Sequence, residues 1–130
     1  MLEITFGWAA FWCAAGVIWT GRGMICMLLA MLLHEMGHLA VLTGQGIPVY
    51  RIRLGFADIK METGPLDDRT ELRCVLAGPG VNLLFWAVLS RFCPPFGAVN
   101  LLLAAFNLLP LPWLDGGRAI RAAYGLLREK

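Results

Sequence analysis

Four long hydrophobic stretches, separated by short polar segments, organise the chain. They run roughly over residues 4–20, 24–43, 72–92 and 96–114. A helix needs about 20 apolar residues to cross the hydrocarbon core of a bilayer, and each stretch approaches that length. The first is short, and Pro110 and Pro112 interrupt the fourth, so either is expected to be tilted, broken or partly re-entrant. The pattern predicts an all-α polytopic membrane protein with about four transmembrane helices.

The polar segment between the second and third stretches follows a different period. Hydrophobic and polar residues alternate over residues 51–56 and again over 58–62. Alternation with a period of two is typical of β-strands. We therefore expect a small β-hairpin at about 49–63. No repeat, flexible linker or second soluble region is visible, so residues 1–130 are expected to form a single intramembrane domain.

Composition agrees with a lipid environment. Hydrophobic residues make up 58% of the chain and charged residues 15%, with a mean hydropathy of +0.67, whereas soluble domains are about half apolar and about 25% charged. The net charge of +2 comes with no arginine-rich stripe, which excludes nucleic acid as an expected partner. The four cysteines show no CxxC spacing and are interpreted as packing residues.

The positive charges indicate how the chain is oriented in the membrane. With four spans, the N-terminus, the segment 44–71 and the C-terminal tail lie on one side. That side carries Arg51, Arg53, Lys60, Arg69, Arg73, Arg118, Arg121, Arg128 and Lys130. The other side carries only Arg22 and Arg91. Because basic residues favour the cytoplasmic side, we expect an integral protein of the bacterial cytoplasmic membrane.

The chemistry is concentrated in His34-Glu35-Met36-Gly37-His38, within the second stretch. Residues four apart share one face of a helix, so both histidines can reach one metal with the glutamate beside them. The motif alone is weak evidence, because such residues are often ordinary surface groups. These are, however, the only two histidines of the chain, and an ionisable group at the bilayer centre costs at least about 2.5–3.5 kcal/mol. The context favours one zinc ion.

A catalytic zinc site usually has three protein ligands, so a third is expected elsewhere. Asp115 is the best candidate, because Pro110 and Pro112 break the helix before it and glycines follow it. Its alternative interpretation is an Asp-Gly turn at the membrane surface. The predicted topology places this aspartate in the cytoplasmic half of the bilayer, at a depth where it can join the two histidines.

Two asparagines also occur at membrane depth. Asn82 follows Ala77-Gly78-Pro79-Gly80 about ten residues into the third stretch, and it could donate a hydrogen bond to a substrate carbonyl or to a neighbouring helix. Asn107 is interpreted as structural, because an amide before a proline break can satisfy freed backbone groups. Arg118 and Arg121 are interpreted as interfacial anchors.

Three motifs together resemble the site-2 protease family of intramembrane zinc metalloproteases. They are the pattern at residues 34–38, the stretch Ala-Gly-Pro-Gly-Val-Asn at 77–82, and Asn-Leu-Leu-Pro-Leu-Pro-Trp-Leu-Asp-Gly-Gly at 107–117. Their order and spacing are similar to those of the family, and the resemblance covers about residues 24–125. The compact form most resembles the bacterial branch that includes the sporulation-specific proteases, which release a sigma factor from a membrane-bound precursor.

The resemblance implies a role for each matching residue. His34, His38 and Asp115 would bind zinc, Glu35 would be the catalytic acid/base, and Asn82 would position the substrate or stabilise the oxyanion. The implied activity is hydrolysis of a peptide bond in or near a transmembrane segment of a protein substrate. The hairpin could hold that segment extended by strand addition. Neither the substrate nor the oligomeric state is indicated by the sequence.

Two alternatives belong to other classes of function. In a membrane metal carrier or channel, the same polar residues would bind an ion in transit, but Glu35 would have no specific task. In a catalytically silent scaffold, the fold would capture transmembrane segments without cutting them. The complete set of ligands and base favours the protease.

Overall fold

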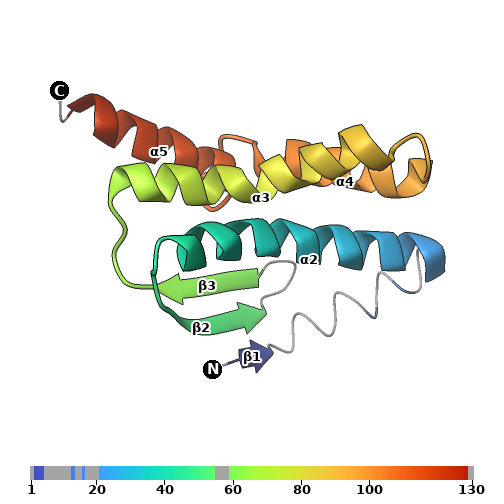
Figure 1. The fold of residues 1–130 in the computed structure, drawn as a ribbon, viewed down its shortest axis with the longest axis horizontal. Coiled ribbons are helices and arrows are strands. Elements are labelled where there is room, and N and C mark those ends of the chain that lie inside the picture. Colours follow the sequence, from blue (N-terminus) through green and yellow to red (C-terminus); the bar gives the residue numbers. More distant parts are fainter. Residues whose placement is uncertain (1, 5–12, 14–15, 17–20, 55–58, 129–130) are drawn as a thin grey trace.

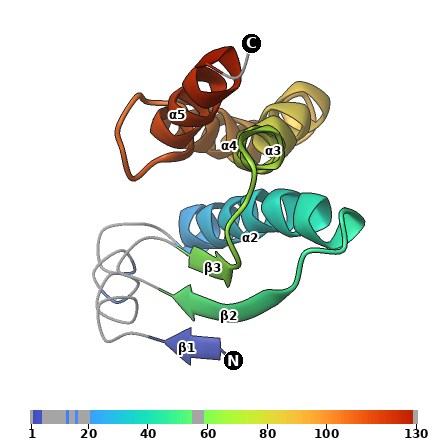
Figure 2. The same cartoon turned by 90° about the vertical axis from the view of Figure 1, so that its left-hand side faces the viewer.

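The computed structural model describes residues 2–4, 13, 16, 21–54 and 59–128. In chain order these form β1 (Leu2–Ile4), α2 (Gly21–Gly44), β2 (Val49–Leu54), β3 (Ile59–Thr63), α3 (Asp68–Leu89), α4 (Pro94–Asn107) and α5 (Asp115–Arg128). Figures 1 and 2 show three layers, with α2 between the small sheet on one side and α3, α4 and α5 on the other. The described part of the chain is mostly helical.

Helices α2 and α3 correspond to the second and third predicted spans. They contain 24 and 22 residues, so at 1.5 Å per residue each is longer than the roughly 30 Å hydrocarbon core. They are the two helices of the described chain that are long and apolar enough to cross a membrane. Only 28% of the apolar window of each helix is buried within the protein. A core helix of a soluble protein would be mostly buried, so this exposure favours contact with lipid.

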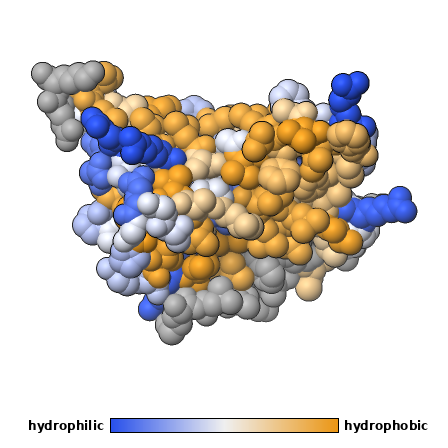
Figure 3. Space-filling model, in the orientation of Figure 1, coloured by the Kyte–Doolittle hydropathy of each residue, from blue (hydrophilic) through white to orange (hydrophobic). Residues whose placement is uncertain are grey.

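The molecular surface supports the same interpretation. Large hydrophobic side chains are exposed on three helices, among them Ile25, Leu29, Leu32, Met36, Leu84, Val88, Leu102 and Phe106. Figure 3 shows hydrophobic residues over most of one face, with hydrophilic residues gathered toward the ends of the long axis. An apolar surface of this extent is unusual for a soluble monomer and typical of a membrane protein.

The start of α3 has a defined cap. The Asp67 side chain accepts a hydrogen bond from the backbone N–H of Thr70, and Asp68 and Glu71 lie in the first turn. Carboxylates at this position satisfy free N–H groups and interact favourably with the helix dipole. The hydrogen bonds from Thr70 lower the pKa of Asp67 below its ordinary value of 3.8. These interactions fix where the chain leaves the hairpin and enters the membrane helix.

Helices α2 and α3 approach each other closely at Gly37. A Cβ atom on this residue would lie 2.7 Å from the carbonyl oxygen of Ala77 and 3.0 Å from the Val81 side chain. Small residues allow helix backbones to approach closely, which is how membrane helices associate in the absence of a hydrophobic driving force. Glycine at this position therefore brings the histidine face of α2 against α3.

The fourth hydrophobic stretch is a broken helix, and its predicted end at residue 114 is wrong. Helix α4 ends at Asn107, and α5 begins at Asp115 after an irregular segment. Pro110 and Pro112 have no N–H to donate, so a regular helix cannot continue through them. The remaining backbone groups are partly paired by short-range bonds, including Leu108 N–H to Ala104 O and Leu114 N–H to Leu111 O. Figure 1 shows α4 and α5 lying along α3 one after the other.

The hairpin is confirmed at the predicted position, between α2 and α3. Strand β2 pairs antiparallel with β3, and β1 pairs parallel with β2, so the strand order is β1-β2-β3. The expectation of an all-α protein is therefore corrected to mostly helical with a three-stranded sheet. Ile4, which we placed at the start of the first span, belongs to β1. Most of that predicted span, 4–20, lies outside the described residues.

We expect Gly37→Ala to destabilise the protein by about 1–3 kcal/mol, because the new methyl group would push against the backbone of α3 and separate the helices. Gly80→Ala is the matched control, since a Cβ at Gly80 in the middle of α3 meets nothing within 4 Å. Thermal unfolding in detergent measures both. Equal stability of the two variants would contradict the close crossing.

Candidate metal centre

His34 and His38 face the crossing between α2 and α3. Their rings meet edge to face, with centroids 4.7 Å apart, and their Nε2 atoms are 3.1 Å apart. His34 is 4% exposed. The helix spacing predicted that the two rings would share a face, and the packing of α3 against that face removes them from solvent.

Asp115 completes a triangle with the two histidines. Its Oδ2 atom lies 3.1 Å from His34 Nε2 and 3.2 Å from His38 Nε2. The residue is 7% exposed and begins α5. Thus three residues separated by up to 81 positions in the sequence each bring one atom to within 3.2 Å of the other two.

The break before α5 is what brings Asp115 to this point. The backbone turns so tightly that a Cβ on Gly116 would lie 2.2 Å from Leu108 O, and one on Gly117 would lie 2.0 Å from Leu111 O. No larger residue fits against those carbonyl oxygens without moving the backbone. The Gly-Gly pair therefore permits the chain to fold back on the irregular segment, which aims the aspartate inward.

The far side of each imidazole faces a hydrogen-bond acceptor. His34 Nδ1 lies 2.6 Å from Asn82 Oδ1, and His38 Nδ1 lies 2.7 Å from the backbone carbonyl oxygen of Cys74. Because oxygen acceptors require N–H partners, both neutral rings carry their proton on Nδ1. Each Nε2 then presents a lone pair toward the other Nε2 and toward the Asp115 carboxylate.

Three electron-pair donors at this separation repel one another unless a cation lies among them. Zinc bound at about 2.0–2.1 Å in tetrahedral geometry holds its ligand atoms about 3.3–3.4 Å apart, close to the separations of 3.1, 3.1 and 3.2 Å found here. Ligating histidines also characteristically donate their other ring N–H to a fixed acceptor. The residues present therefore fit one zinc ion with two nitrogen ligands and one oxygen ligand.

Gly78 leaves room for both imidazole rings. A Cβ at this position would lie 2.5 Å from His38 Cε1 and Nε2 and 2.8 Å from His34 Cε1. The sequence showed this glycine only as part of the stretch that precedes Asn82. In the structure, the backbone of α3 at Gly78 packs directly against both imidazole rings, which explains why this position has no side chain.

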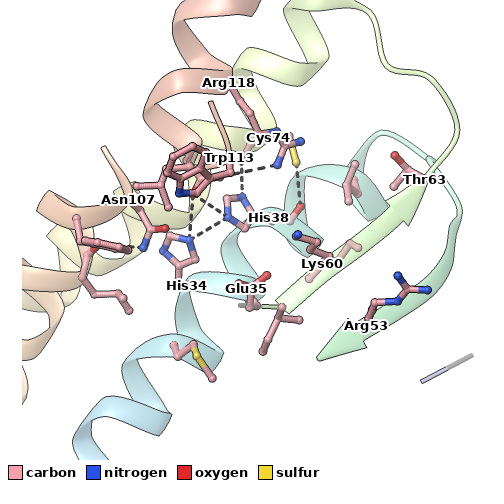
Figure 4. Close-up of a pocket in the computed structure, with 18 of the residues that line it drawn as sticks. His34, Glu35, His38, Arg53, Lys60, Thr63, Cys74, Asn107, Trp113 and Arg118 are labelled. Atoms are coloured by element: carbon pink, nitrogen blue, oxygen red, sulfur yellow. Dashed lines mark hydrogen bonds and ion pairs between the residues drawn. The ribbon is translucent and has the colours of Figure 1, made fainter. Parts of the chain in front are cut away.

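Glu35 lies beside the triangle. Its carboxylate belongs, with the two imidazoles, to a group whose ligand atoms all lie within 4.8 Å of one another. Its side chain is half-buried and lines the same cavity. Figure 4 shows the two imidazoles and Glu35 in this cavity. A carboxylate at this place can exchange protons with a molecule bound at the triangle.

The cavity has a volume of about 840 Å³. Side chains of α2 and α4 form much of its hydrophobic wall, including Met27, Met31, Leu102, Leu103 and Phe106. Every residue of β3 from Ile59 to Thr63 also lines it, together with Arg118 and Asn107. The cavity thus joins an apolar wall, a strand edge and the ligand triangle, which suits an extended peptide with hydrophobic side chains.

The structure places Asn82 behind His34, fully buried at 0% exposure. Its amide nitrogen donates to Ala30 O and to Asn100 Oδ1, at 3.0 and 2.8 Å. Both N–H groups are therefore donated within the protein. The expected hydrogen bond from Asn82 to a substrate carbonyl stays a prediction, and this geometry does not support it.

The other polar candidates occupy the cavity or its rim. Asn107 donates to the carbonyl of Leu103 one turn earlier, as its structural interpretation expects, and it also lines the cavity. Arg118 donates to Glu71 at 2.9 Å and its Nη1 atom lies 3.9 Å from Asp115 Oδ1. It therefore joins α5 to α3 next to the site, beyond the anchoring role we assigned to it. Arg121 is exposed and contacts Pro112 O at 3.5 Å.

Sequence reasoning missed Asn100. It is fully buried, and its side chain connects Asn82 to the backbone of α4. The only available signal was an amide inside a hydrophobic stretch of membrane length, which is costly unless it is paired.

Known proteins are similar to this chain in sequence and in fold. Residues 85–130 match peptidase family M50. The chain is 31% identical to a zinc metalloprotease of Methanocaldococcus jannaschii, over 81% of this chain and 36% of the relative. It is 34% identical to Rip3 of Mycobacterium tuberculosis, described as a candidate zinc metalloprotease, over 83% of this chain and 33% of the relative. The chain spans about a third of the length of these curated relatives.

The chain is therefore similar to zinc metalloproteases of peptidase family M50, the site-2 protease family. Its fold is similar to that of the site-2 protease from Methanocaldococcus jannaschii, with a TM-score of 0.78, covering 99% of this chain and 68% of the other at 24% identity. Site-2 proteases are integral membrane proteins, which agrees with the two membrane-capable helices. The similarity to zinc metalloproteases also agrees with the histidine and glutamate group on α2.

We expect Gly78→Ala to weaken zinc binding by roughly 10- to 100-fold, the range found when the surroundings of metal ligands are altered. The added methyl group would meet movable imidazoles instead of backbone, so the loss of affinity should exceed the loss of stability. Gly80→Ala again serves as the control and should bind zinc normally. Competition with a chelator measures the affinity, and an unchanged value for Gly78→Ala would contradict the proposed ligand geometry.

Proposed function

We propose that this protein is an intramembrane zinc metalloendopeptidase, which hydrolyses a peptide bond in or near a transmembrane segment of a membrane protein. The observation that carries the proposal is the convergence of His34 Nε2, His38 Nε2 and Asp115 Oδ2 within 3.2 Å of one another, with Glu35 beside them. The two histidines and the glutamate belong to a helix long and apolar enough to cross a bilayer.

The mechanism assigns one task to each group. His34, His38 and Asp115 hold one zinc ion, which when bound lowers the pKa of a water molecule and polarises a carbonyl group. The Glu35 carboxylate takes a proton from the attacking water and delivers it to the nitrogen of the leaving amine. The hydrophobic cavity wall keeps other water away from the reacting groups, which strengthens electrostatic interactions there.

The substrate segment must be extended before it can be cut, because a helix hides its carbonyl groups in hydrogen bonds. The sheet offers a place for extension. Strand β1 pairs with one edge of β2, so β3 forms the opposite edge of the sheet, and β3 lines the cavity. A substrate strand added along β3 would pass in front of Glu35 and the two histidines. The proposed partners are thus a transmembrane protein or peptide and the lipid bilayer.

The location of the site follows from the charge pattern. Helix α2 ends, and α3 begins, at the end of the molecule where the hairpin connects them, and α5 extends toward that end (Figure 1). Most basic residues belong to these segments. We infer that this end lies in the cytoplasm and that the site opens toward it, in a bacterial cytoplasmic membrane. Membership of the sporulation-type subgroup, which the sequence resemblance suggested, remains a proposal.

We expect Glu35→Gln to retain zinc and to lose cleavage by roughly 10²- to 10⁴-fold, because glutamine keeps the shape of the side chain but cannot carry the proton. Cleavage of a model transmembrane substrate in detergent, with zinc content determined in the same sample, makes the measurement. Wild-type cleavage by this variant would refute the protease mechanism. Metal transport or substrate capture that survives in this variant, with no cleavage by the wild type, would instead favour a carrier or a silent scaffold.

A second expectation concerns strand addition on β3. In an antiparallel strand successive N–H groups point to opposite edges, so of single prolines at Met61 and Glu62, one removes an N–H from the outer edge and the other removes one on the side of β2. The edge variant should lose roughly fivefold in cleavage, corresponding to one hydrogen bond of about 1 kcal/mol, with unchanged zinc content and stability. Full cleavage by that variant would exclude strand addition on β3.

A further inference from the structure

Two asparagines behind the metal centre, Asn82 on α3 and Asn100 on α4, form a buried chain of hydrogen bonds that leads to His34. Both side chains are fully buried. Asn100 Nδ2 donates to Phe96 O at 2.9 Å, Asn82 Nδ2 donates to Asn100 Oδ1 at 2.8 Å, and Asn82 Oδ1 faces His34 Nδ1 at 2.6 Å. The cost of burying amides in an apolar helix bundle indicates that this arrangement does more than fill space.

The direction of every bond in this chain is fixed by a backbone carbonyl. Phe96 O can only accept, so the nitrogen of the Asn100 amide must face it and the Asn100 oxygen must face Asn82. The Asn82 nitrogen must then face Asn100, and its oxygen must face His34. Ala30 O, which accepts from the same Asn82 nitrogen at 3.0 Å, imposes the same orientation independently.

The last bond decides which nitrogen of His34 can bind a metal. Because the Asn82 oxygen requires a donor, the His34 proton is held on Nδ1 and Nε2 keeps its lone pair. If the Asn82 amide were flipped, its nitrogen would donate to Nδ1, the ring proton would move to Nε2, and that atom could no longer bind zinc. His38 needs no such chain, because Cys74 O accepts directly from its Nδ1.

We propose that Asn100 is a positioning residue for the metal centre, which acts through Asn82 to hold His34 in the tautomer that binds zinc. Asn100 contacts neither the proposed metal position nor the cavity. The Phe96 carbonyl fixes the orientation of the Asn100 amide, which in turn fixes the orientation of the Asn82 amide across the interface between α4 and α3. The same chain ties α4, which leads into the segment before Asp115, to the helix that carries the histidines. This inference rests on the proposed function only in taking His34 as a zinc ligand.

Two substitutions separate this role from simple packing. Asn100→Leu keeps the branched shape but removes the acceptor for Asn82. Asn100→Asp, which is neutral when its buried carboxyl group is protonated, can donate to Phe96 O and accept from Asn82, so it preserves the bond directions. The control is Gly80→Ala, two residues before Asn82 on α3, because a Cβ there meets nothing within 4 Å and the hydrogen bonds of both asparagines stay intact.

The first test is zinc affinity, measured on the full chain, purified without a histidine tag, by competition with a chelator. We expect Asn100→Leu to bind zinc roughly tenfold or more weakly, and Asn100→Asp and Gly80→Ala to bind it as the wild type does. Wild-type affinity of Asn100→Leu would overturn the proposal. A loss shared equally by Asn100→Asp would also overturn it, because that variant keeps both the shape of the side chain and the bond directions on which the proposal depends.

The second test reads the tautomer directly and needs no variant. The chain has only two histidines, so nitrogen NMR of histidine-labelled protein loaded with zinc reports both rings. We expect both to carry the proton on Nδ1 in the wild type, with His34 alone gaining the Nε2–H form in Asn100→Leu. A wild-type His34 with its proton on Nε2 would refute the relay, whether or not the variant folds. Neither reading depends on cleavage, so failure of the protease proposal would be seen separately.

Discussion

The close crossing of α2 and α3 is the constraint on which the rest of the structure depends. Gly37 lets the two backbones meet, with Ala77 O at 2.7 Å from the place of its missing Cβ. At that distance the carbonyl of Cys74 and the amide of Asn82 reach the far sides of both imidazoles. The same proximity leaves no room for a side chain at Gly78. The close packing of α2 against α3 therefore also sets the orientation of the two imidazole rings.

The broken helix solves a separate problem, namely how to bring a carboxylate to membrane depth. An uninterrupted fourth helix would point Asp115 to one side of a regular rod, and its cost in lipid would be high. The prolines end α4, the irregular segment lines protein and cavity, and the Gly-Gly pair lets α5 restart against the carbonyls of Leu108 and Leu111. Irregular backbone is tolerated in membranes in such sheltered places. The new helix start then delivers the aspartate to the histidines.

Particular residues show how far sequence reasoning reached. The spacing of His34 and His38 predicted a shared helix face because the helix period is fixed by local geometry. The alternation over residues 51–62 predicted the hairpin for the same local reason. The fourth stretch was placed correctly as interrupted, but its helix end and the restart at Asp115 depend on how the chain folds back on itself. The pairing of β1 with β2 is non-local, and no local pattern in residues 2–4 could reveal it.

By itself, the sequence determined the membrane-length helices, the hairpin between them and the candidate metal-binding side chains, because composition and periodicity are local properties. Only the tertiary structure decided that Asp115 meets the histidines within 3.2 Å and that Asn82 is committed to His34. It alone revealed that Asn100 stands behind that pair. These contacts join helices distant in the chain, and the direction of each hydrogen bond is set by carbonyl groups whose positions exist only after the helices have packed.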